Sequence, residues 1–270
     1  MGSCLKIGVT LVSLFFAAYS GLAQNLVPNS GFENITDSAG LTKSSTSYFS
    51  CIEGWRRVSG LPDYWNFRFK EKTTRNPTPK AGDACMGMHV TFARPNSMPS
   101  FESFGIQLTK PLVKGQRYYA EMYVTQDLKH YPKPIDNLGM YFSSIPFNEL
   151  IGNSKGMERL KKIAAMQPQV ISPAGEPLKN RGDWMLISGE FEATGGEKFL
   201  TIGRFRFEMS DLSATVYYYF DDIVVVPVEE KNTIETTDFA KMLESKEPLR
   251  LENVFSKRGR PPFKNNHFPN

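Results

Sequence analysis

Apolar and polar residues alternate along much of this chain, which is the period of a β-strand with one buried face. In residues 84–91, Ala84, Met86, Met88 and Val90 alternate with smaller or polar residues. The same pattern predicts further strands at residues 104–112, 117–126, 137–143, 184–192, 199–207 and 216–226.

Helical spacing of apolar residues is clear in one place only, residues 155–166, and it stops at Pro168. Gly115 and the Gly195-Gly196 pair favour tight turns between neighbouring strands. Many short strands and one brief helix predict an all-β fold, a sandwich of two sheets with one short helix.

The composition favours the same class. The chain has 270 residues, of which 40% are hydrophobic and 22% charged, so it can bury a core without help from metals or disulfides. Its 20 Phe and 11 Tyr, together with 21 Gly and 18 Pro, are typical of strands and turns and argue against a helical bundle.

The charge distribution argues against a nucleic-acid partner, although the formal net charge is +4. Five of the 32 Lys and Arg residues lie in the N-terminal leader and the C-terminal tail, which leaves 27 in the body against 28 Asp and Glu. A nearly neutral body lacks the basic surface that phosphate backbones require.

Residues 1–23 resemble a secretory signal peptide: Lys6 precedes an apolar run, and Gly21 and Ala23 are small residues at the cleavage positions. The alternative is a membrane anchor, but the apolar run is shorter than the roughly 20 residues that a bilayer requires. We therefore expect export to the periplasm, to the outer membrane as an associated protein, or to the cell surface. We expect no membrane span after cleavage.

Cys51 and Cys85 are the cysteines that remain after cleavage. Two cysteines in an exported protein can form a disulfide, which would stabilise the fold by about 3 to 4 kcal/mol. The alternative is an unpaired Cys85 buried on a core strand. The sequence leaves both open, because it does not give the separation of the two residues.

The chain divides into four parts. After the signal peptide we expect one sandwich domain at residues 24–228, then a linker with a strand-like remnant at residues 229–255. Residues 256–270 contain two adjacent prolines, no acidic residue and no apolar period, and they are predicted to be a disordered tail.

Three segments carry a resemblance to a known fold: NLVPNSGFE near the start, DWMLISGEFEATGGEKFLTIGRF late in the chain, and YYYFDDIVVV at the end of the sandwich. Together they resemble carbohydrate-binding-module jelly rolls, the galactose-binding-like folds appended to xylanases and cellulases. The resemblance frames residues 25–227 and implies a jelly-roll sandwich.

The segments CIEGWRRVSGLPDYWN, GDACMGM and PLVKGQRYYAEMYV also resemble a secreted family of Gram-negative bacteria. In that family such a jelly roll precedes a peptidoglycan-binding domain of the outer-membrane-protein-A type. The resemblance ends at Phe255, and the peptidoglycan-binding domain is absent. We therefore expect a truncated or frame-shifted product, and peptidoglycan binding is not carried over.

The resemblance to carbohydrate-binding modules implies a structural calcium ion held by Glu33 together with Asp221 or Asp222. Hard oxygen ligands and an extracellular setting suit calcium. Asp221 shares its parity in the strand with Ile223 and Val225, so we expect Asp221 to point inward and Asp222 outward. The alternative is that these acids cap turns or pair with a nearby lysine.

An aromatic cluster at residues 51–69 has the chemistry of a sugar-binding platform. Trp55, Tyr64 and Trp65 can stack on the apolar face of a pyranose ring, and Asn66 can bond to its hydroxyl groups. The alternative is that the two tryptophans are core residues that anchor a long loop.

The sequence contains no HExxH, GxSxG, CxxC or P-loop motif, so we predict that the protein is not an enzyme. We predict an exported, calcium-stabilised carbohydrate-binding module of a cell-envelope protein, with a polysaccharide or envelope glycan as partner. The first alternative is a structural or adaptor module that contacts another envelope protein. A glycoside hydrolase is the third hypothesis.

Overall fold

The computed structural model describes residues 24–36, 49, 51–69, 78–91, 93, 100–179, 183–207 and 214–229. The predicted signal peptide, nearly all of the predicted linker and the predicted tail lie outside these residues. Within the described part of the chain, no helix is both long enough and apolar enough to cross a bilayer.

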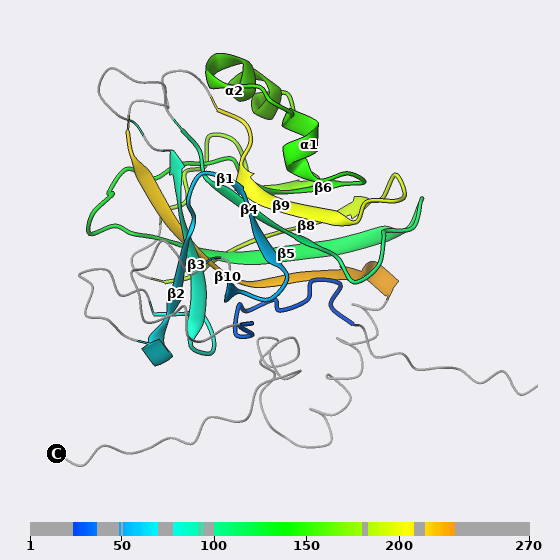
Figure 1. Ribbon diagram of the computed structural model, residues 1–270, viewed down its shortest axis with the longest axis horizontal. Helices are drawn as coiled ribbons and strands as arrows, with labels where there is room; N and C mark the ends of the chain where they lie inside the picture. The colour runs from blue at the N-terminus through cyan, green and yellow to red at the C-terminus, as the bar shows by residue number, and fades with distance from the viewer. Residues whose placement is uncertain are drawn as a thin grey trace, which may run out of the picture.

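The described residues form two five-stranded antiparallel sheets that pack face to face (Figure 1). The first sheet has the order β1 (Trp55–Ser59), β4 (Ser103–Gln107), β9 (Phe199–Arg204), β6 (Leu138–Ser143) and β7 (Val170–Ile171). The second sheet has the order β2 (Asp63–Asn66), β3 (Ala84–Thr91), β10 (Val216–Pro227), β5 (Arg117–Gln126) and β8 (Met185–Glu192). The predicted all-β sandwich is confirmed.

Short helical segments accompany the strands, among them η3 (Phe67–Phe69), α1 (Phe147–Ile151) and α2 (Gly156–Ala164). The helix predicted at residues 155–166 is α2. The sequence pattern missed α1, β1, β2 and β7, because each has only two to five residues and too few positions to establish a period. Strand β4 also ends at Gln107, ahead of the predicted end at residue 112.

The main core lies between the two sheets and is built by the predicted alternation. In β3, Ala84, Met86, Met88 and Val90 belong to this core. In β5, the inward residues are Tyr118, Ala120, Met122 and Val124. Burying one large apolar side chain, such as that of Met86 or Met122, stabilises the fold by about 1.5 to 3 kcal/mol.

Strand β10 contains a β-bulge that reverses its alternation. The pairing with β5 shifts between Asp221 and Val224, and Asp222 has a positive φ of 49°. Phe220 and Ile223 therefore both face the core, although an uninterrupted strand would place them on opposite faces. The predicted orientation of Asp221 needs a correction: it is fully buried, but on the outer face of the second sheet, opposite Tyr123.

The outer face of the first sheet is covered by the two α-helices (Figure 1). Phe147 and Ile151 of α1 and Ile163 of α2 form a second apolar cluster with Phe205, which follows β9. Tyr141 of β6 packs against this cluster. The outer face of the second sheet has a different cover, which forms the candidate site.

Candidate functional site

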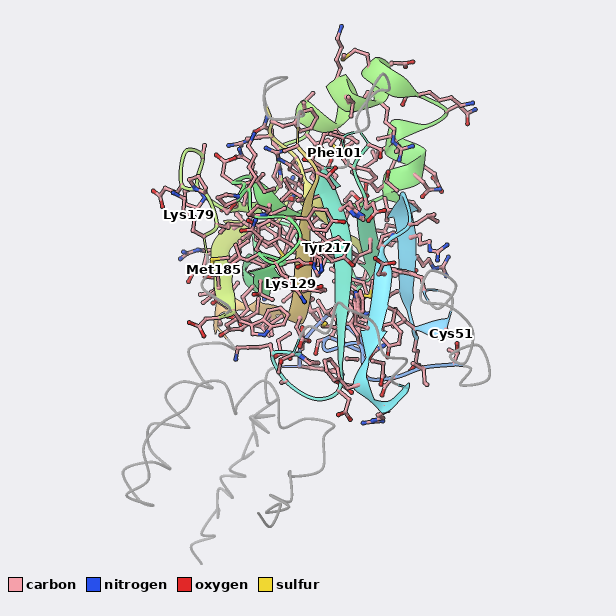
Figure 2. All side chains as sticks on the ribbon, turned by 90° about the vertical axis from the view of Figure 1, so that its left-hand side faces the viewer. Cys51, Phe101, Lys129, Lys179, Met185 and Tyr217 are labelled. Atoms are coloured by element: carbon pink, nitrogen blue, oxygen red, sulfur yellow. The ribbon has the colours of Figure 1, made fainter. Side chains whose placement is uncertain are left out.

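Aromatic side chains gather on the outer face of the second sheet, outside the main core. Buried Tyr217 and Tyr219 pack there with Cys85, and half-buried aromatic rings pack around them. The aromatic face is defined here as Trp65, Tyr131, Trp184, Tyr217 and Tyr219. Figure 2 views the molecule from the side on which Tyr217 lies near the middle of the second sheet.

Strand pairing explains why these side chains meet. Trp65 of β2 lies opposite Cys85 of β3, and Tyr217 of β10 lies opposite His89. Tyr219 lies opposite Gly87, which has no side chain to fill the space between the neighbouring strands. A Cβ atom at Gly87 would lie 2.1 Å from Tyr217 Oη and 2.7 Å from Trp65 Nε1. The glycine therefore lets the Tyr217 ring lie across β3.

Tyr217 of β10 is hydrogen-bonded to two residues of β2, on the far side of β3. Its Oη donates to Asp63 Oδ2 at 2.8 Å and accepts from Trp65 Nε1 at 3.1 Å. Burial, followed by the negative charge of Asp63, raises the pKa of Tyr217 well above its ordinary value. The hydroxyl therefore stays protonated and holds Asp63 and Trp65 in a fixed relation.

His89 and Tyr131 extend the network along the sheet. The His89 ring meets Tyr217 edge to face, with centroids 4.8 Å apart, and its Nε2 lies 3.4 Å from Tyr131 Oη. Tyr131 stacks on Tyr217 at 6.0 Å. Next to them, the Asp127 carboxylate lies 2.9 Å from His130 Nδ1. Polar atoms thus surround the rings of the aromatic face.

The rings differ in their exposure. Tyr217 is 0% and Tyr219 5% exposed, whereas Trp65, Tyr131 and Trp184 are half-buried. The half-buried rings can therefore offer surface to a ligand, while the two buried tyrosines support them. Trp65 packs edge to face on Tyr219, with centroids 6.0 Å apart.

The predicted platform at residues 51–69 is wrong for Trp55 and Tyr64, each only 3% exposed. Trp55 packs in the core against Phe32 and Phe104, and its Nε1 donates to Asn29 O. Tyr64 Oη donates to Phe32 O. The physical reason is that β1 and β2 lie in opposite sheets and turn both rings inward.

Trp65 does lie on the aromatic face, and Asn66 does not. Asn66 is half-buried; its Nδ2 donates to Tyr64 Oη, and its Oδ1 accepts from the Arg68 amide. The sequence interpretation missed Tyr217 and Tyr219 as site residues. The sequence signal for these two residues is the alternation of the strand. Tyr218 and Phe220 face the core, so Tyr217 and Tyr219 face the other side of the sheet.

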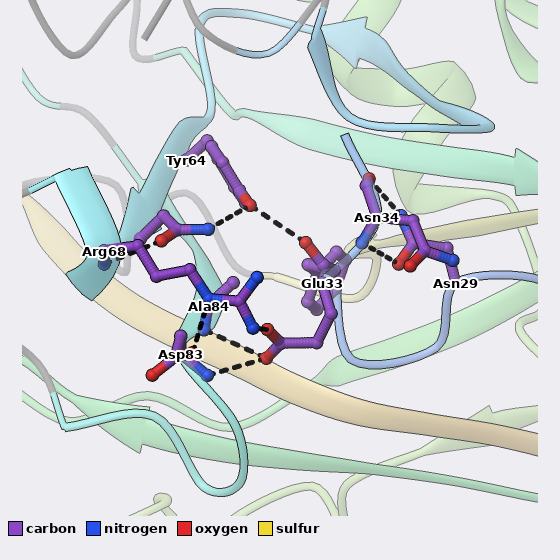
Figure 3. Close-up of polar contacts among 9 residues, drawn as sticks. Asn29, Glu33, Asn34, Tyr64, Arg68, Asp83 and Ala84 are labelled. Atoms are coloured by element: carbon purple, nitrogen blue, oxygen red, sulfur yellow. Dashed lines mark hydrogen bonds and ion pairs between the residues drawn. The ribbon is translucent and has the colours of Figure 1, made fainter. Parts of the chain in front are cut away.

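Glu33 and Asp221, the residues expected to bind calcium, flank one loop at residues 80–84 (Figure 3 shows the Glu33 side). Glu33 Oε1 accepts hydrogen bonds from the amides of Asp83 and Ala84, at 2.8 and 3.1 Å. Asp221 Oδ2 accepts from the amides of Lys80 and Ala81. Half-buried Asp222 contributes its backbone amide, which donates to Asp221 Oδ1.

These contacts do not match a calcium site well. Calcium is bound by six to eight oxygen atoms, whereas the groups aimed at Glu33 and Asp221 are N–H donors. The described part of the chain contains no group of three or more His, Cys, Asp or Glu residues that could hold a metal ion. Calcium at Glu33, Asp221 and Asp222 stays a prediction.

Of the two alternatives that the sequence leaves open, the disulfide is not formed, because Cys51 and Cys85 are both buried free thiols. Cys85 is on β3 and faces the outer side of the second sheet, and Cys51 precedes β1 of the other sheet. Burial raises the pKa of the Cys85 thiol well above its ordinary value. The unpaired alternative for Cys85 is therefore the observed one.

Comparison with known proteins assigns no family to the chain. No protein-family model matches it, and no curated protein matches it. Similar solved structures include the K1 cleaved adhesin domain of Lys-gingipain from Porphyromonas gingivalis W83, with 13% identity, a TM-score of 0.38, and coverage of 72% of this chain and 94% of that one.

Two other similar structures are named for enzymes of two different kinds, a xylanase and a cyclase. The CBM22-1-GH10 modules of Clostridium thermocellum xylanase 10B have 14% identity and a TM-score of 0.35, with 64% of this chain and 26% of that chain covered. The Stig cyclase Fisc from Fischerella sp. TAU has 13% identity and a TM-score of 0.40, with 76% and 97% covered.

Proposed function

We propose that this protein is a non-catalytic carbohydrate-binding module of an exported cell-envelope protein, and that the aromatic face binds its glycan. The observation that carries the proposal is a group of Trp and Tyr rings outside the core, with hydrogen-bonding groups beside them. The signal-peptide pattern of residues 1–23 supports export.

The chemistry of the aromatic face suits a sugar. A pyranose ring has an apolar face that stacks on indole or phenol, and its hydroxyl groups need polar partners at the edge. Trp65 and Tyr131 supply half-buried rings, and Asp63 and His89 lie beside them. The network through Tyr217 Oη fixes Trp65 before a ligand arrives, which lowers the entropy cost of binding.

Two tryptophans of neighbouring segments provide a matched test. Trp65→Ala should weaken glycan binding by about 1 to 3 kcal/mol, because it removes a stacking ring. It should lower the free energy of unfolding by only about 1 kcal/mol, since the ring is half-buried. Trp55→Ala should leave a core cavity and cost about 3 to 5 kcal/mol of folding free energy.

The measurement combines a binding isotherm against xylan, cellulose and peptidoglycan oligosaccharides with urea unfolding of the same samples. The proposal would be contradicted if none of these ligands binds at millimolar concentration. A Trp65→Ala protein that is as destabilised as the Trp55→Ala protein would also contradict it. In either case, an envelope protein recovered by affinity capture would favour the adaptor function.

A further inference from the structure

The loop at residues 80–84 is held by acidic side chains from the two ends of the domain. Glu33 belongs to the first described segment, and Asp221 belongs to the last strand, β10. Each carboxylate accepts two backbone amides of the loop through one oxygen atom, at distances of 2.8 to 3.2 Å. Bonds from an amide to an ionised carboxylate are among the stronger hydrogen bonds in proteins.

A positive side chain lies at the same place. Arg68 Nε lies 2.6 Å from Asp83 Oδ2 in the loop, and its Nη2 lies 3.8 Å from Glu33 Oε2. The hydrogen bond to Asp83, with the negative charges of Asp83 and Glu33, raises the pKa of Arg68, so this guanidinium stays charged. Arg68 is 59% exposed in its side chain, which limits its contribution to stability.

Amide hydrogens and a metal ion compete for the same lone pairs. An N–H group that points at a carboxylate oxygen presents a partial positive charge, which repels a cation that approaches that oxygen. Asp221 uses both of its oxygen atoms in this way, because Oδ1 also accepts the amide of Asp222. Both oxygen atoms of Asp221 are therefore hydrogen-bonded within the chain, whereas Glu33 Oε2 is buried without a hydrogen bond and faces the positive charge of Arg68 at 3.8 Å.

We infer that Glu33 and Asp221 form a metal-independent clasp on the 80–84 loop, in which loop amides and Arg68 take the place of the calcium ion expected from the sequence. The clasp joins the start of the domain to its last strand through β3, the strand that the loop leads into. It does not depend on the proposed glycan binding, and its test uses no glycan.

The test compares the wild type and Asp221→Asn by thermal melting, in millimolar calcium chloride and in excess EGTA. The clasp predicts the same wild-type melting temperature in both conditions. Asp221→Asn should melt several degrees lower, by the same amount in both, because an amide NH₂ group would face a backbone N–H. Asp222→Asn is the matched control and should melt close to the wild type, since asparagine tolerates its positive φ of 49°.

A calcium site predicts the opposite pattern. The wild-type melting temperature would rise with calcium until saturation and fall in EGTA, and Asp221→Asn would remove that dependence. This result would overturn the clasp. If Asp221→Asn does not fold, native mass spectrometry of the wild type decides: the clasp predicts the mass of the chain alone, and a one-to-one calcium adduct that Glu33→Gln removes would overturn it.

The contribution of Arg68 to the clasp is tested by comparison with Arg56. Arg68→Met should lower the melting temperature more than Arg56→Met, because Arg56 is an exposed arginine of β1 and lies in the other sheet. Equal melting temperatures of the two variants would overturn the part of the inference that gives Arg68 the role of the cation.

Discussion

The two outer faces of the sandwich are both covered by aromatic side chains, but the covers differ in their polar atoms. On the first sheet, Phe147 and Phe205 pack with aliphatic residues of α1 and α2. On the second sheet, Trp65 and Tyr217 each carry a polar atom that is hydrogen-bonded within the face. A mainly apolar cover stabilises the fold, whereas a cover with oriented polar atoms can also recognise a ligand.

The largest predicted effect concerns the helix-covered face. Phe205→Ala should lower the free energy of unfolding by about 3 to 5 kcal/mol, because Phe205 is fully buried between α1 and the first sheet. The folded fraction should bind glycan with unchanged affinity. Urea unfolding and a binding isotherm below the transition check both statements, and a loss of affinity in the folded protein would break the division between the faces.

Gly87→Ala is predicted to disturb the aromatic face at a cost of about 1 to 3 kcal/mol, the usual cost of overpacking. The new methyl group would collide with Tyr217 Oη and Trp65 Nε1. Gly189→Ala in β8 is the matched control, since its Cβ would make ordinary contacts of 3.4 to 3.5 Å with Val170. Chemical unfolding should separate the two variants, and equal stability would contradict the close packing of the aromatic face.

Tyr217→Phe tests the titration of the aromatic face. At neutral pH the lost hydrogen bonds should cost about 0.5 to 1.5 kcal/mol. The folded-state pKa of Tyr217 is raised by burial, so its contribution is fully present below the unfolded pKa of about 10 and is lost as pH rises above it. The stability difference between wild type and variant should therefore shrink above about pH 10.

Unfolding in urea at a series of alkaline pH values measures this difference. Leu160→Ala is the control, because it removes an apolar contact near the helix-covered face and should cost the same at each pH. A Tyr217→Phe difference that stays constant across the alkaline range would show that the hydroxyl titrates normally in the folded protein.

The smallest predicted effect is that of a reducing agent. A bridge between Cys51 and Cys85 would tie a segment of the first sheet to the second, and its loss would cost about 3 to 4 kcal/mol. Because both thiols are free, reductant should change the free energy of unfolding by less than about 0.5 kcal/mol. A fall of several degrees in melting temperature with reductant would reinstate the disulfide.

Much of the sandwich could be predicted from alternation, since strands such as β3 and β5 bury every second residue in one core. The candidate site could be predicted only in part. Trp55 and Trp65 lie in one aromatic segment with no clear period, and nothing local shows that their strands join opposite sheets. Which face a ring occupies is decided by strand partners far away in sequence, such as Ile106 for Trp55 and Cys85 for Trp65.

Asp221 illustrates a second limit. Asp221 and Ile223 are two positions apart, which predicts that they face the same side of the sheet. That prediction holds only while the strand continues without an extra residue. The bulge at Asp222 breaks that condition. Aspartate is among the residues that tolerate positive φ, yet this tolerance does not mark a bulge among the many aspartates of a chain.

The β10 bulge also makes the length of this strand as important as its composition. Deletion of Asp222 alone would restore the two-residue period and leave Ile223 and Val225 on the core face, whereas one residue inserted between Asp222 and Ile223 would carry both to the opposite face of the second sheet. After such an insertion no side chain would change in chemistry, yet the core would lose two aliphatic residues. An engineer who moves the aromatic face onto another sandwich should therefore transplant the strand from Tyr217 through Val225 as a unit of fixed length.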